Sequence, residues 1–232
     1  MISVIMPTFN EAGNIIEVIK RTVKTLKSGF EIIVVDDNSP DGTAEVVRKF
    51  QKGQSCLKLI VRKNEPRGLP AAIKRGLDNA KGEIVAWLDC DLSMPPEKFP
   101  GMLQMLGQND IIIGSTFIKG AKDQRNKFHS QLFSLLINRL AQLILGSDIT
   151  DYTSGFIVAK KKAIEGTLFE GYHGAYFIDL IYRAKKKGYK ITEVPYVLAP
   201  RGSGETKIVI FWPYIKTGFY YLWVLFKTRF FS

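Results

Sequence analysis

Carboxylates follow three of the short apolar runs in the first hundred residues of this 232-residue chain. One lies after the first run, and a pair lies after each of the second and fourth: Glu11, Asp36, Asp37, Asp89 and Asp91. If the runs are parallel strands, their carboxyl ends meet along one edge of a sheet, which is where such sheets bind ligands. Five carboxylates gathered there repel one another, so they require either raised pKa values or a cation.

Asp89 and Asp91 have the spacing of a metal-binding pair. They flank one residue, so in an extended segment both carboxylates point to one side while Cys90 points to the other. Such a pair suits one hard divalent ion, Mg²⁺ or Mn²⁺, with few protein ligands and with substrate phosphates completing its shell. Two acids at this spacing are also common on protein surfaces, but their position after a wholly apolar run favours the metal site.

Two cations near the end of the chain are candidates to bind an anionic group. Arg201 and Lys207 bracket a polar segment rich in glycine that is predicted to be a loop. Charged loops beside a strand end are typical of functional sites, and both side chains suit a phosphate. The alternative is that they are ordinary exposed charges.

The elements that must position these residues alternate between strands and helices. Four apolar runs predict strands at residues 2–6, 31–35, 57–61 and 84–88. The segments between them carry apolar residues at helical spacing. This order predicts a doubly wound, mostly parallel α/β sheet.

The second half of the chain has a less regular pattern. Strands are predicted near residues 111–115, 155–159 and 191–197, and helices at 128–145 and 175–187. The helix at 128–145 is too apolar for an ordinary exposed helix. It is either buried between the sheet and the C-terminal tail, which is favoured, or it contacts a membrane.

Basic residues are concentrated in the second half of the chain. Residues 1–120 hold 16 Lys and Arg against 14 Asp and Glu, whereas residues 121–232 hold 17 against 8, and the formal net charge is +11. This asymmetry favours an anionic partner, either nucleic acid or an acidic membrane surface, over an evenly charged solvated surface.

The tail from residue 206 onward distinguishes between these partners. It has no acid, four basic residues and ten aromatic residues, and Pro213, Lys216 and Gly218 interrupt its apolar run. Because a membrane-spanning helix needs about 20 nearly uninterrupted apolar residues, the tail is predicted to lie in the headgroup layer as an amphipathic segment. A buried C-terminal helix is the alternative. No nucleic-acid partner is expected, because base-stacking platforms lie on more polar surfaces.

Composition and cysteine content narrow the class of protein. With 46% hydrophobic and 24% charged residues, the chain fits one globular domain and not a collagen, a coiled coil or a disordered protein. Cys56 and Cys90 are far apart and have no neighbouring Cys/His cluster, which argues against a disulfide framework or structural zinc and for a reducing compartment. The apolar run at residues 2–7 is too short for a secretory leader, so secretion is not expected.

Five stretches, taken in order, resemble the successive motifs of inverting family 2 glycosyltransferases. Three of them follow predicted strands: Pro7 to Glu11, Asp36 to Thr43, and Asp89 to Ser93 with Pro95 and Pro96. The other two are similar to signatures of the dolichol-phosphate mannose synthase subgroup: Thr153 to Phe156, and Arg201 to Lys207. The resemblance covers residues 2–207.

The resemblance implies a fold and a reaction. The fold is of the GT-A type, a Rossmann-like sheet forming a catalytic domain at residues 1–207, followed by a membrane-interface segment at residues 208–232. The reaction is metal-dependent transfer of a hexose, mannose from GDP-mannose in this subgroup, to dolichyl or another polyprenyl phosphate. The expected setting is the cytoplasmic face of a membrane, where the enzyme would be peripheral, and a membrane-anchoring partner subunit is compatible with it.

The resemblance also implies roles for individual residues. The base and ribose of the donor would be held by Pro7, Phe9, Glu11, Asp37, Gly68 and Leu69. Asp89 and Asp91 would bind the metal and, through it, the diphosphate, while Arg201 and Lys207 would hold the acceptor phosphate. Asp179 stands where the family carries an acid near the acceptor, and it acts either as a base or positioning group or as a simple helix-surface carboxylate.

Two other functions remain open. One is a related family 2 enzyme that uses a UDP-sugar such as UDP-glucose, or another acceptor. The other is a non-catalytic, membrane-bound homologue that acts as a binding subunit, because Thr116 stands where the family has an arginine after a serine. The presence of the acids and cations named above argues against this last alternative.

Overall fold

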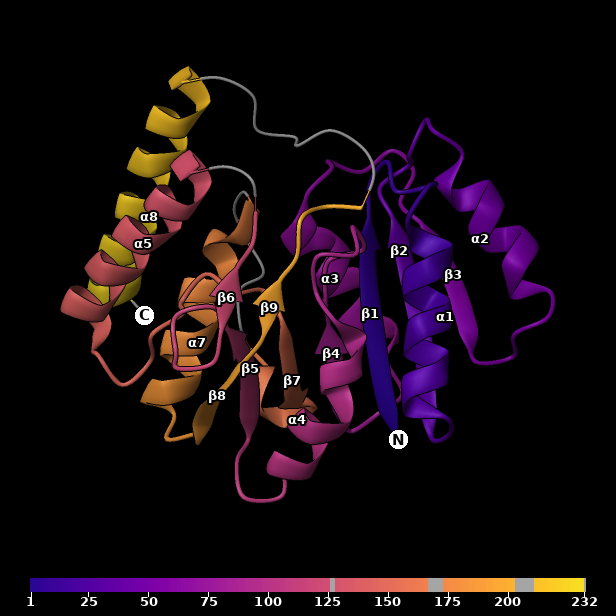
Figure 1. The fold of residues 1–232 in the computed structure, drawn as a ribbon, viewed down its shortest axis with the longest axis horizontal. Helices are drawn as coiled ribbons and strands as arrows, with labels where there is room; N and C mark the ends of the chain where they lie inside the picture. The colour runs from indigo at the N-terminus through magenta and orange to yellow at the C-terminus, as the bar shows by residue number, and fades with distance from the viewer. Residues whose placement is uncertain (126–127, 167–172, 203–210, 232) are drawn as a thin grey trace.

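A seven-stranded sheet with helices on both faces forms the body of the molecule (Figure 1). The structure is a computed structural model that describes residues 1–125, 128–166, 173–202 and 211–231. Its first half contains β1 (Ile2–Thr8), α1 (Ile15–Leu26), β2 (Phe30–Asp36), α2 (Thr43–Gln51), β3 (Leu57–Val61), α3 (Leu69–Asn79) and β4 (Ile84–Trp87). The four strands pair in parallel, which confirms the predicted doubly wound α/β class.

The second half completes the sheet and adds the helices at its far end. It contains η1 (Pro96–Lys98), α4 (Phe99–Met105), β5 (Ile111–Ser115), β6 (Lys122–Asp123), α5 (Phe128–Leu145), β7 (Ile157–Lys160), α6 (Lys161–Ile164), η2 (His173–Ala175), α7 (Tyr176–Lys186), β8 (Ile191–Pro195), β9 (Val197–Leu198) and α8 (Phe211–Phe231). The strand order is β3-β2-β1-β4-β7-β5-β8, and β7 runs antiparallel between β4 and β5.

The strand predicted at 191–197 is divided between two sheets. β8 ends at Pro195, and β9 pairs in parallel with β6 outside the main sheet. Tyr196 makes the crossing, because its N–H donates to the Ser115 carbonyl at 3.3 Å and its own carbonyl accepts from the Lys122 N–H at 3.1 Å. The crossing directs the chain after β9 across the carboxyl edge of the sheet.

Alternation along the central strand fills two apolar layers. Ile5 packs with residues of α3 and α7 on one face, whereas Val4 and Met6 pack with α1 and α4 on the other. Successive side chains of a strand point to opposite faces, so both faces of β1 must be covered by helices. The near-continuous apolar runs of the sequence reflect this double burial.

α5 and α8 lie side by side at one end of the molecule (Figure 1). α8 buries Tyr221, Val224 and Leu225 in the same apolar cluster as α5 and α7. Pro213 falls in its first turn, where a missing N–H is tolerated, and the helix continues through Gly218. The tail therefore contributes to the core.

The outer sides of these two helices are apolar as well. α5 buries one stripe, as expected for this helix, but the rest of its surface and that of α8 expose large hydrophobic side chains: Phe128, Leu132, Leu135, Leu136, Leu140, Leu143, Phe219, Leu222, Trp223, Phe226, Phe230 and Phe231. Within the described ranges, no helix is both long enough and apolar enough to cross a membrane. The predicted membrane association of the tail stays a prediction.

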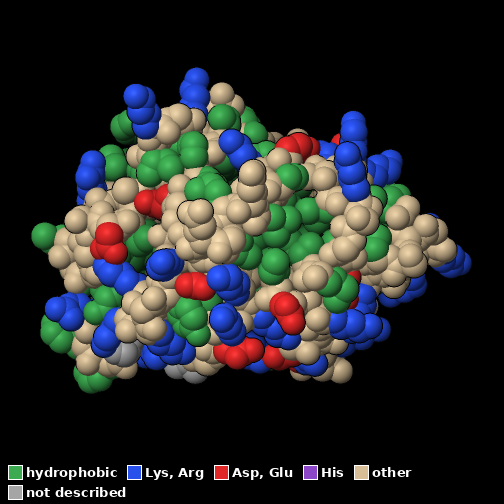
Figure 2. Space-filling view, turned by 90° about the horizontal axis from the view of Figure 1, so that it is seen from below, with side chains coloured by type: hydrophobic (Ala, Val, Ile, Leu, Met, Phe, Trp, Pro, Cys, Tyr) green, Lys and Arg blue, Asp and Glu red, His purple; other side chains and the backbone are tan. Residues whose placement is uncertain are grey.

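Lys and Arg side chains do not form one patch on the face at the bottom of Figure 1, where the N-terminus lies. Figure 2 shows that side from below, with Lys and Arg side chains spread over it and acidic side chains between them. The described residues on this face form no single cationic surface for a polyanion.

Candidate active site

A cavity of about 770 Å³ opens over the carboxyl ends of β1, β2 and β4. α3, α5, α8 and the segment that follows β9 form its other walls. It brings together nine of the residues predicted from the sequence: Pro7, Phe9, Glu11, Asp37, Gly68, Leu69, Asp89, Asp91 and Arg201. Residues almost 200 positions apart in the chain therefore line one space.

Asp36 is the one member of the five predicted carboxylates that does not line this cavity. It is fully buried and accepts hydrogen bonds from the Ser39 N–H at 2.9 Å, the Ser39 hydroxyl at 2.5 Å and the Thr8 hydroxyl at 3.2 Å. These bonds fix the turn after β2. Asp36 thus holds the position of its neighbour Asp37.

Asp37 is held in a buried ion pair with Arg62. Both side chains are about 95% buried, and the second carboxylate oxygen of Asp37 accepts the Gly68 N–H at 2.7 Å. Arg62 also donates to the Pro66 carbonyl at 2.8 Å and to Glu65 at 3.2 Å. Removing either partner would leave an uncompensated buried charge, which costs about 3 to 5 kcal/mol. The pair therefore fixes the 62–68 loop that leads into α3. Arg62 supports the site through Asp37, and it was not predicted from the sequence.

An aromatic and cationic pair lies at the same end of the cavity. The guanidinium of Arg67 is 4.5 Å from the centre of the Phe9 ring, which is a cation–π contact. Both residues line the cavity beside Asp37. A flat ring and a planar cation give this end two surfaces on which an aromatic base can stack.

Asp91 occupies a tight turn after β4. Its Oδ1 accepts the Ser93 N–H at 3.0 Å and the Ser93 hydroxyl at 2.5 Å, and its backbone carbonyl accepts the Gly202 N–H at 2.9 Å. Leu92, between them, has a positive φ of 69°, which is uncommon for a leucine. The turn directs Asp91 into the cavity together with Asp89.

Arg201 closes the acidic side of the cavity. One guanidinium nitrogen pairs with Glu11 Oε1, and the other lies 3.5 Å from Asp91 Oδ2. The Glu11 side chain is only 6% exposed, and its other oxygen accepts from Asn14 Nδ2 at 2.9 Å. The cation required by the gathered carboxylates is therefore supplied in this structure by the chain itself.

Asp89 and Asp91, which follow β4, fit a divalent ion that takes most of its ligands from groups other than the protein. Asp89 and Asp91 present carboxylate oxygens, which Mg²⁺ and Mn²⁺ prefer. Across residues 1–125, 128–166, 173–202 and 211–231, no group of three or more His, Cys, Asp and Glu side chains could hold a metal. The set suits an ion bound through one or two carboxylates, with phosphate oxygens and water as the remaining ligands.

The opposite end of the cavity is built around Asp151. Its Oδ2 accepts the N–H and the hydroxyl of Thr116 at 3.1 and 3.2 Å, and its Oδ1 accepts the N–H and the hydroxyl of Thr153 at 3.2 and 3.3 Å. Burial is the main reason that the pKa of Asp151 is raised to about 6, and the charge of Glu193 adds to it. Asp151 was not predicted; its place just before the motif that begins at Thr153 was the available signal.

Arg125 and Tyr196 complete this end. The guanidinium of Arg125 donates to both oxygens of Asp123, at 2.6 to 3.1 Å, and lines the cavity. Burial raises the pKa of Tyr196, and the charges of Asp151 and Asp89 raise it further. Tyr196 therefore lies within electrostatic reach of both the acidic pair and Asp151.

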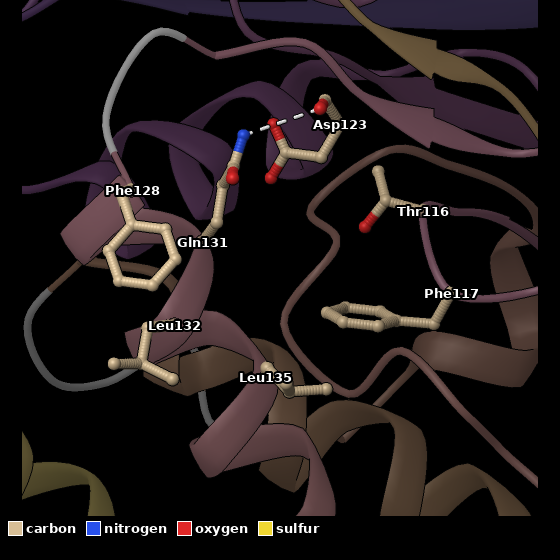
Figure 3. Close-up of a pocket in the computed structure, with 7 residues that line it drawn as sticks. All are labelled: Thr116, Phe117, Asp123, Phe128, Gln131, Leu132 and Leu135. Atoms are coloured by element: carbon tan, nitrogen blue, oxygen red, sulfur yellow. Dashed lines mark hydrogen bonds between the residues drawn. The ribbon is translucent and has the colours of Figure 1, made fainter.

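A smaller cavity of about 290 Å³ adjoins the main one, since both are lined by Thr116 and Phe117. Figure 3 shows these two residues on one side and Phe128, Leu132 and Leu135 of α5 on the other. Gln131 closes it by donating to the Asp123 carbonyl at 3.3 Å. The main cavity thus leads from charged groups towards an apolar space.

One predicted residue, Asp179, is not brought to the site, and another cannot be placed. Asp179, on α7, accepts from Arg183 Nε at 2.7 Å and from the Thr228 hydroxyl of α8 at 3.3 Å, and it is not among the described residues that line the cavity. This position favours the helix-surface alternative. Lys207 lies outside the described residues.

Sequence comparison matches the chain to one protein family and to two similar proteins. The profile of glycosyl transferase family 2 matches residues 3–168. The chain is 32% identical over 212 residues to a dolichol-phosphate mannosyltransferase of Pyrococcus furiosus, covering 89% of this chain and 59% of the relative. It is 29% identical over 209 residues to an undecaprenyl-phosphate 4-deoxy-4-formamido-L-arabinose transferase of Edwardsiella ictaluri, covering 89% and 62%. The chain thus spans about three fifths of these relatives.

Solved structures share the fold. Glucosyl-3-phosphoglycerate synthase from Mycobacterium tuberculosis, in complex with Mn²⁺, UDP and glucosyl-3-phosphoglycerate, matches with a TM-score of 0.73 and 19% identity, covering 99% of this chain and 80% of that one. The same enzyme with Mg²⁺ and UDP matches with a TM-score of 0.71 and 18% identity, covering 99% and 79%. At this identity the likeness establishes the fold, and it confirms the predicted GT-A architecture.

The buried carboxyl of Asp151 predicts a pH dependence of stability. Its pKa is raised to about 6 in the folded protein and is about 3.9 when unfolded, so the folded state binds the extra proton between these values. The stability of wild type relative to Asp151→Asn should therefore fall by about 2 kcal/mol as the pH rises from 4 to 7. Urea unfolding of both proteins at several pH values measures this difference. A difference that is constant with pH, or that grows as the pH rises, would contradict the raised pKa.

Proposed function

The chain belongs to glycosyl transferase family 2, and on that premise we propose that it is a metal-dependent inverting glycosyltransferase. Its donor is a nucleoside-diphosphate hexose, specifically GDP-mannose, and its acceptor is dolichyl or another polyprenyl phosphate. The observation that carries the proposal is one continuous cavity with carboxylates and Arg201 at one end and with Arg125, hydroxyl groups and an apolar side cavity at the other. The names of the two curated relatives agree with a polyprenyl-phosphate acceptor.

The end of the cavity near Phe9 suits the base and ribose of the donor. Pro7, Phe9, Gly68 and Leu69 provide apolar and backbone surfaces there. Asp37 acts in part indirectly, because both of its oxygens already bind Arg62 and the Gly68 N–H, which fixes the loop that forms the wall. Glu11 lies between this end and Arg201.

Asp89 and Asp91 are the residues that would hold Mg²⁺ or Mn²⁺. When bound, the ion supplies Lewis-acid stabilisation of the negative charge that develops on the leaving diphosphate. With the ion bound, the two carboxylates would orient the diphosphate, and Arg201 is close enough to Asp91 to donate to the same phosphate groups. These groups favour departure of the diphosphate from the anomeric carbon.

The acceptor approaches from the other end, and its phosphate reaches the acidic end, where Arg201 lies beside Asp91. One oxygen of this phosphate attacks the anomeric carbon as the bond to the diphosphate breaks, which inverts the configuration. Because a phosphate monoester is already anionic near neutral pH, it needs cations to position it more than it needs a base. Arg201 and Lys207 are the proposed cations, and the apolar cavity of Figure 3 suits the first part of a prenyl chain.

The need for a base also separates this proposal from its alternatives. A hydroxyl acceptor would require one, and Asp179, the predicted candidate, pairs instead with Arg183 away from the cavity. A UDP-sugar donor remains the alternative for the same site, and UDP is bound by the structurally similar M. tuberculosis enzyme. A donor comparison distinguishes the two.

The exposed apolar sides of α5 and α8 support a peripheral position on a membrane, and the resemblance to the family implies its cytoplasmic face. Lys227 lies 5.2 Å from the centre of the Trp223 ring, so a cation accompanies the exposed aromatic residues. Aromatic rings and basic side chains are favoured at the membrane–water interface. A membrane-anchoring subunit that covers the same surface is compatible with this position.

Metal dependence is the first test of the proposal. Asp91→Ala should abolish transfer and Asp89→Ala should lower it strongly, since each change removes a carboxylate that would hold the ion. The measurement is transfer of radiolabelled sugar from GDP-mannose and, separately, from UDP-glucose to a short polyprenyl phosphate. Asp78→Ala, which removes a half-exposed carboxylate on α3, is the matched control and should keep the wild-type rate.

Each outcome of this assay has a definite meaning. Full activity of Asp91→Ala, or of wild type in excess EDTA, would contradict the metal assignment. Transfer from UDP-glucose alone would identify the alternative donor. No transfer by wild type from either donor would favour the non-catalytic homologue.

Membrane contact is tested by point changes on the outer side of α8. Trp223→Ser combined with Phe226→Ser should reduce co-sedimentation with anionic liposomes several-fold, because both side chains are more than half exposed and would lose interfacial contact. Deleting the helix would be less informative, since it would also remove buried Tyr221 and Leu225. Met105→Ser, the same kind of change at an exposed position on α4, should have no effect. Undiminished sedimentation of the double variant would show that α8 does not make the contact.

A further inference from the structure

Both carboxylate oxygens of Asp91 already have partners within the chain. Oδ1 accepts two hydrogen bonds from Ser93, at 2.5 and 3.0 Å, and Oδ2 faces the Arg201 guanidinium at 3.5 Å. The same guanidinium pairs with Glu11. A divalent ion that binds Asp91 through Oδ2 therefore needs the space in which the guanidinium lies.

The backbone around Arg201 is fixed against the turn that carries Asp91. The Ala199 N–H donates to the Ser93 carbonyl at 3.0 Å, and the Gly202 N–H donates to the Asp91 carbonyl at 2.9 Å. A Cβ on Gly202 would lie 2.6 Å from Leu92 Cδ1, so any larger residue would require the Leu92 side chain to shift. The backbone is thus anchored on both sides of Arg201, and its side chain is the part that can exchange partners.

Electrostatics makes the guanidinium and a metal ion competitors for one role. The Glu11 and Asp91 side chains are only 6% and 17% exposed, so their charges are poorly screened by solvent. A planar guanidinium with five donors can bridge two carboxylates and relieve their repulsion. A divalent ion relieves the same repulsion, and after it binds, phosphate oxygens become the suitable partners for the arginine.

We propose that Arg201 is a positioning residue of the metal site, which pairs with Glu11 and Asp91 while no metal is bound and is exchanged for the divalent ion when it enters. This inference rests on the proposed metal role of Asp89 and Asp91. Metal binding and the Arg201–carboxylate pairing oppose each other, so removing the guanidinium strengthens metal binding in the absence of nucleotide. If Arg201 did not compete with the ion for these carboxylates, its removal would raise that affinity only as much as the loss of another cation does.

The test measures Mn²⁺ binding by the loss of the electron paramagnetic resonance signal of free Mn²⁺. Without nucleotide, Arg201→Gln should bind Mn²⁺ about tenfold more tightly than wild type, within the usual range of coupling between two sites. Arg201→Lys, which keeps a charge but cannot bridge two carboxylates, should lie between them. With saturating GDP or UDP the gain should shrink, because in wild type the released arginine then contributes to diphosphate binding.

A charge-matched control removes the effect of net charge. Arg48→Gln deletes one cation on α2, where the side chain is 56% exposed and its partner Glu45 is 3.8 Å away. It should bind Mn²⁺ as wild type does. An equal gain in Arg48→Gln and Arg201→Gln would overturn the inference, because a long-range charge effect would then account for both.

The remaining outcomes separate the inference from the proposed function. Wild-type or weaker Mn²⁺ affinity in a folded Arg201→Gln protein overturns the inference alone, provided that wild type binds the ion. If that variant shows no cooperative thermal unfolding, Arg201→Lys decides, and an affinity no higher than that of wild type overturns the inference. Absence of Mn²⁺ binding by wild type, even with GDP or UDP, overturns the proposed metal site and the inference with it.

Discussion

Charge compensation at the carboxyl edge of the sheet is the constraint on which the rest of the site depends. Four of the carboxylates that line the cavity lie at this edge, and two arginines from later parts of the chain neutralise the two most buried of these four: Arg62 pairs with Asp37, and Arg201 pairs with Glu11. Each arginine brings its own segment to the edge, the 62–68 loop in one case and the chain after β9 in the other. The need to neutralise these carboxylates thus also brings two of the segments that surround the cavity into place.

The chain after β8 links the two ends of the cavity. Tyr196 crosses from the main sheet to the β6–β9 pair, Asp151 ties the Thr116 and Thr153 segments together, and Arg201 returns to the acidic turn. α5 and α8 cover the apolar end and share a core with α7. A charged end and an apolar end of the cavity therefore belong to one framework, as the proposed transfer between a nucleotide sugar and a lipid phosphate would require.

The sequence predicted the alternation of strands and helices and the position of the acidic residues, because both follow from local periodicity. It missed Arg62 and Asp151, since their importance arises from burial and from partners distant in the chain. It also left burial and membrane contact as alternatives for α5 and α8. The structure buries one side of each helix, and the other side exposes large apolar residues, so membrane contact stays a prediction. α4 was not predicted, because apolar spacing is weak between residues 96 and 105.

The central claim is that the arginine-closed, acidic cavity binds a nucleotide sugar together with a divalent ion. The most direct measurement is the thermal unfolding midpoint of the wild-type protein with increasing GDP-mannose or UDP-glucose, in Mn²⁺ and in EDTA. The account predicts a midpoint that rises with the concentration of one donor when Mn²⁺ is present and stays unchanged in EDTA, since a ligand that binds only the folded state stabilises it. A midpoint that neither donor raises, or an equal rise in EDTA, would contradict it.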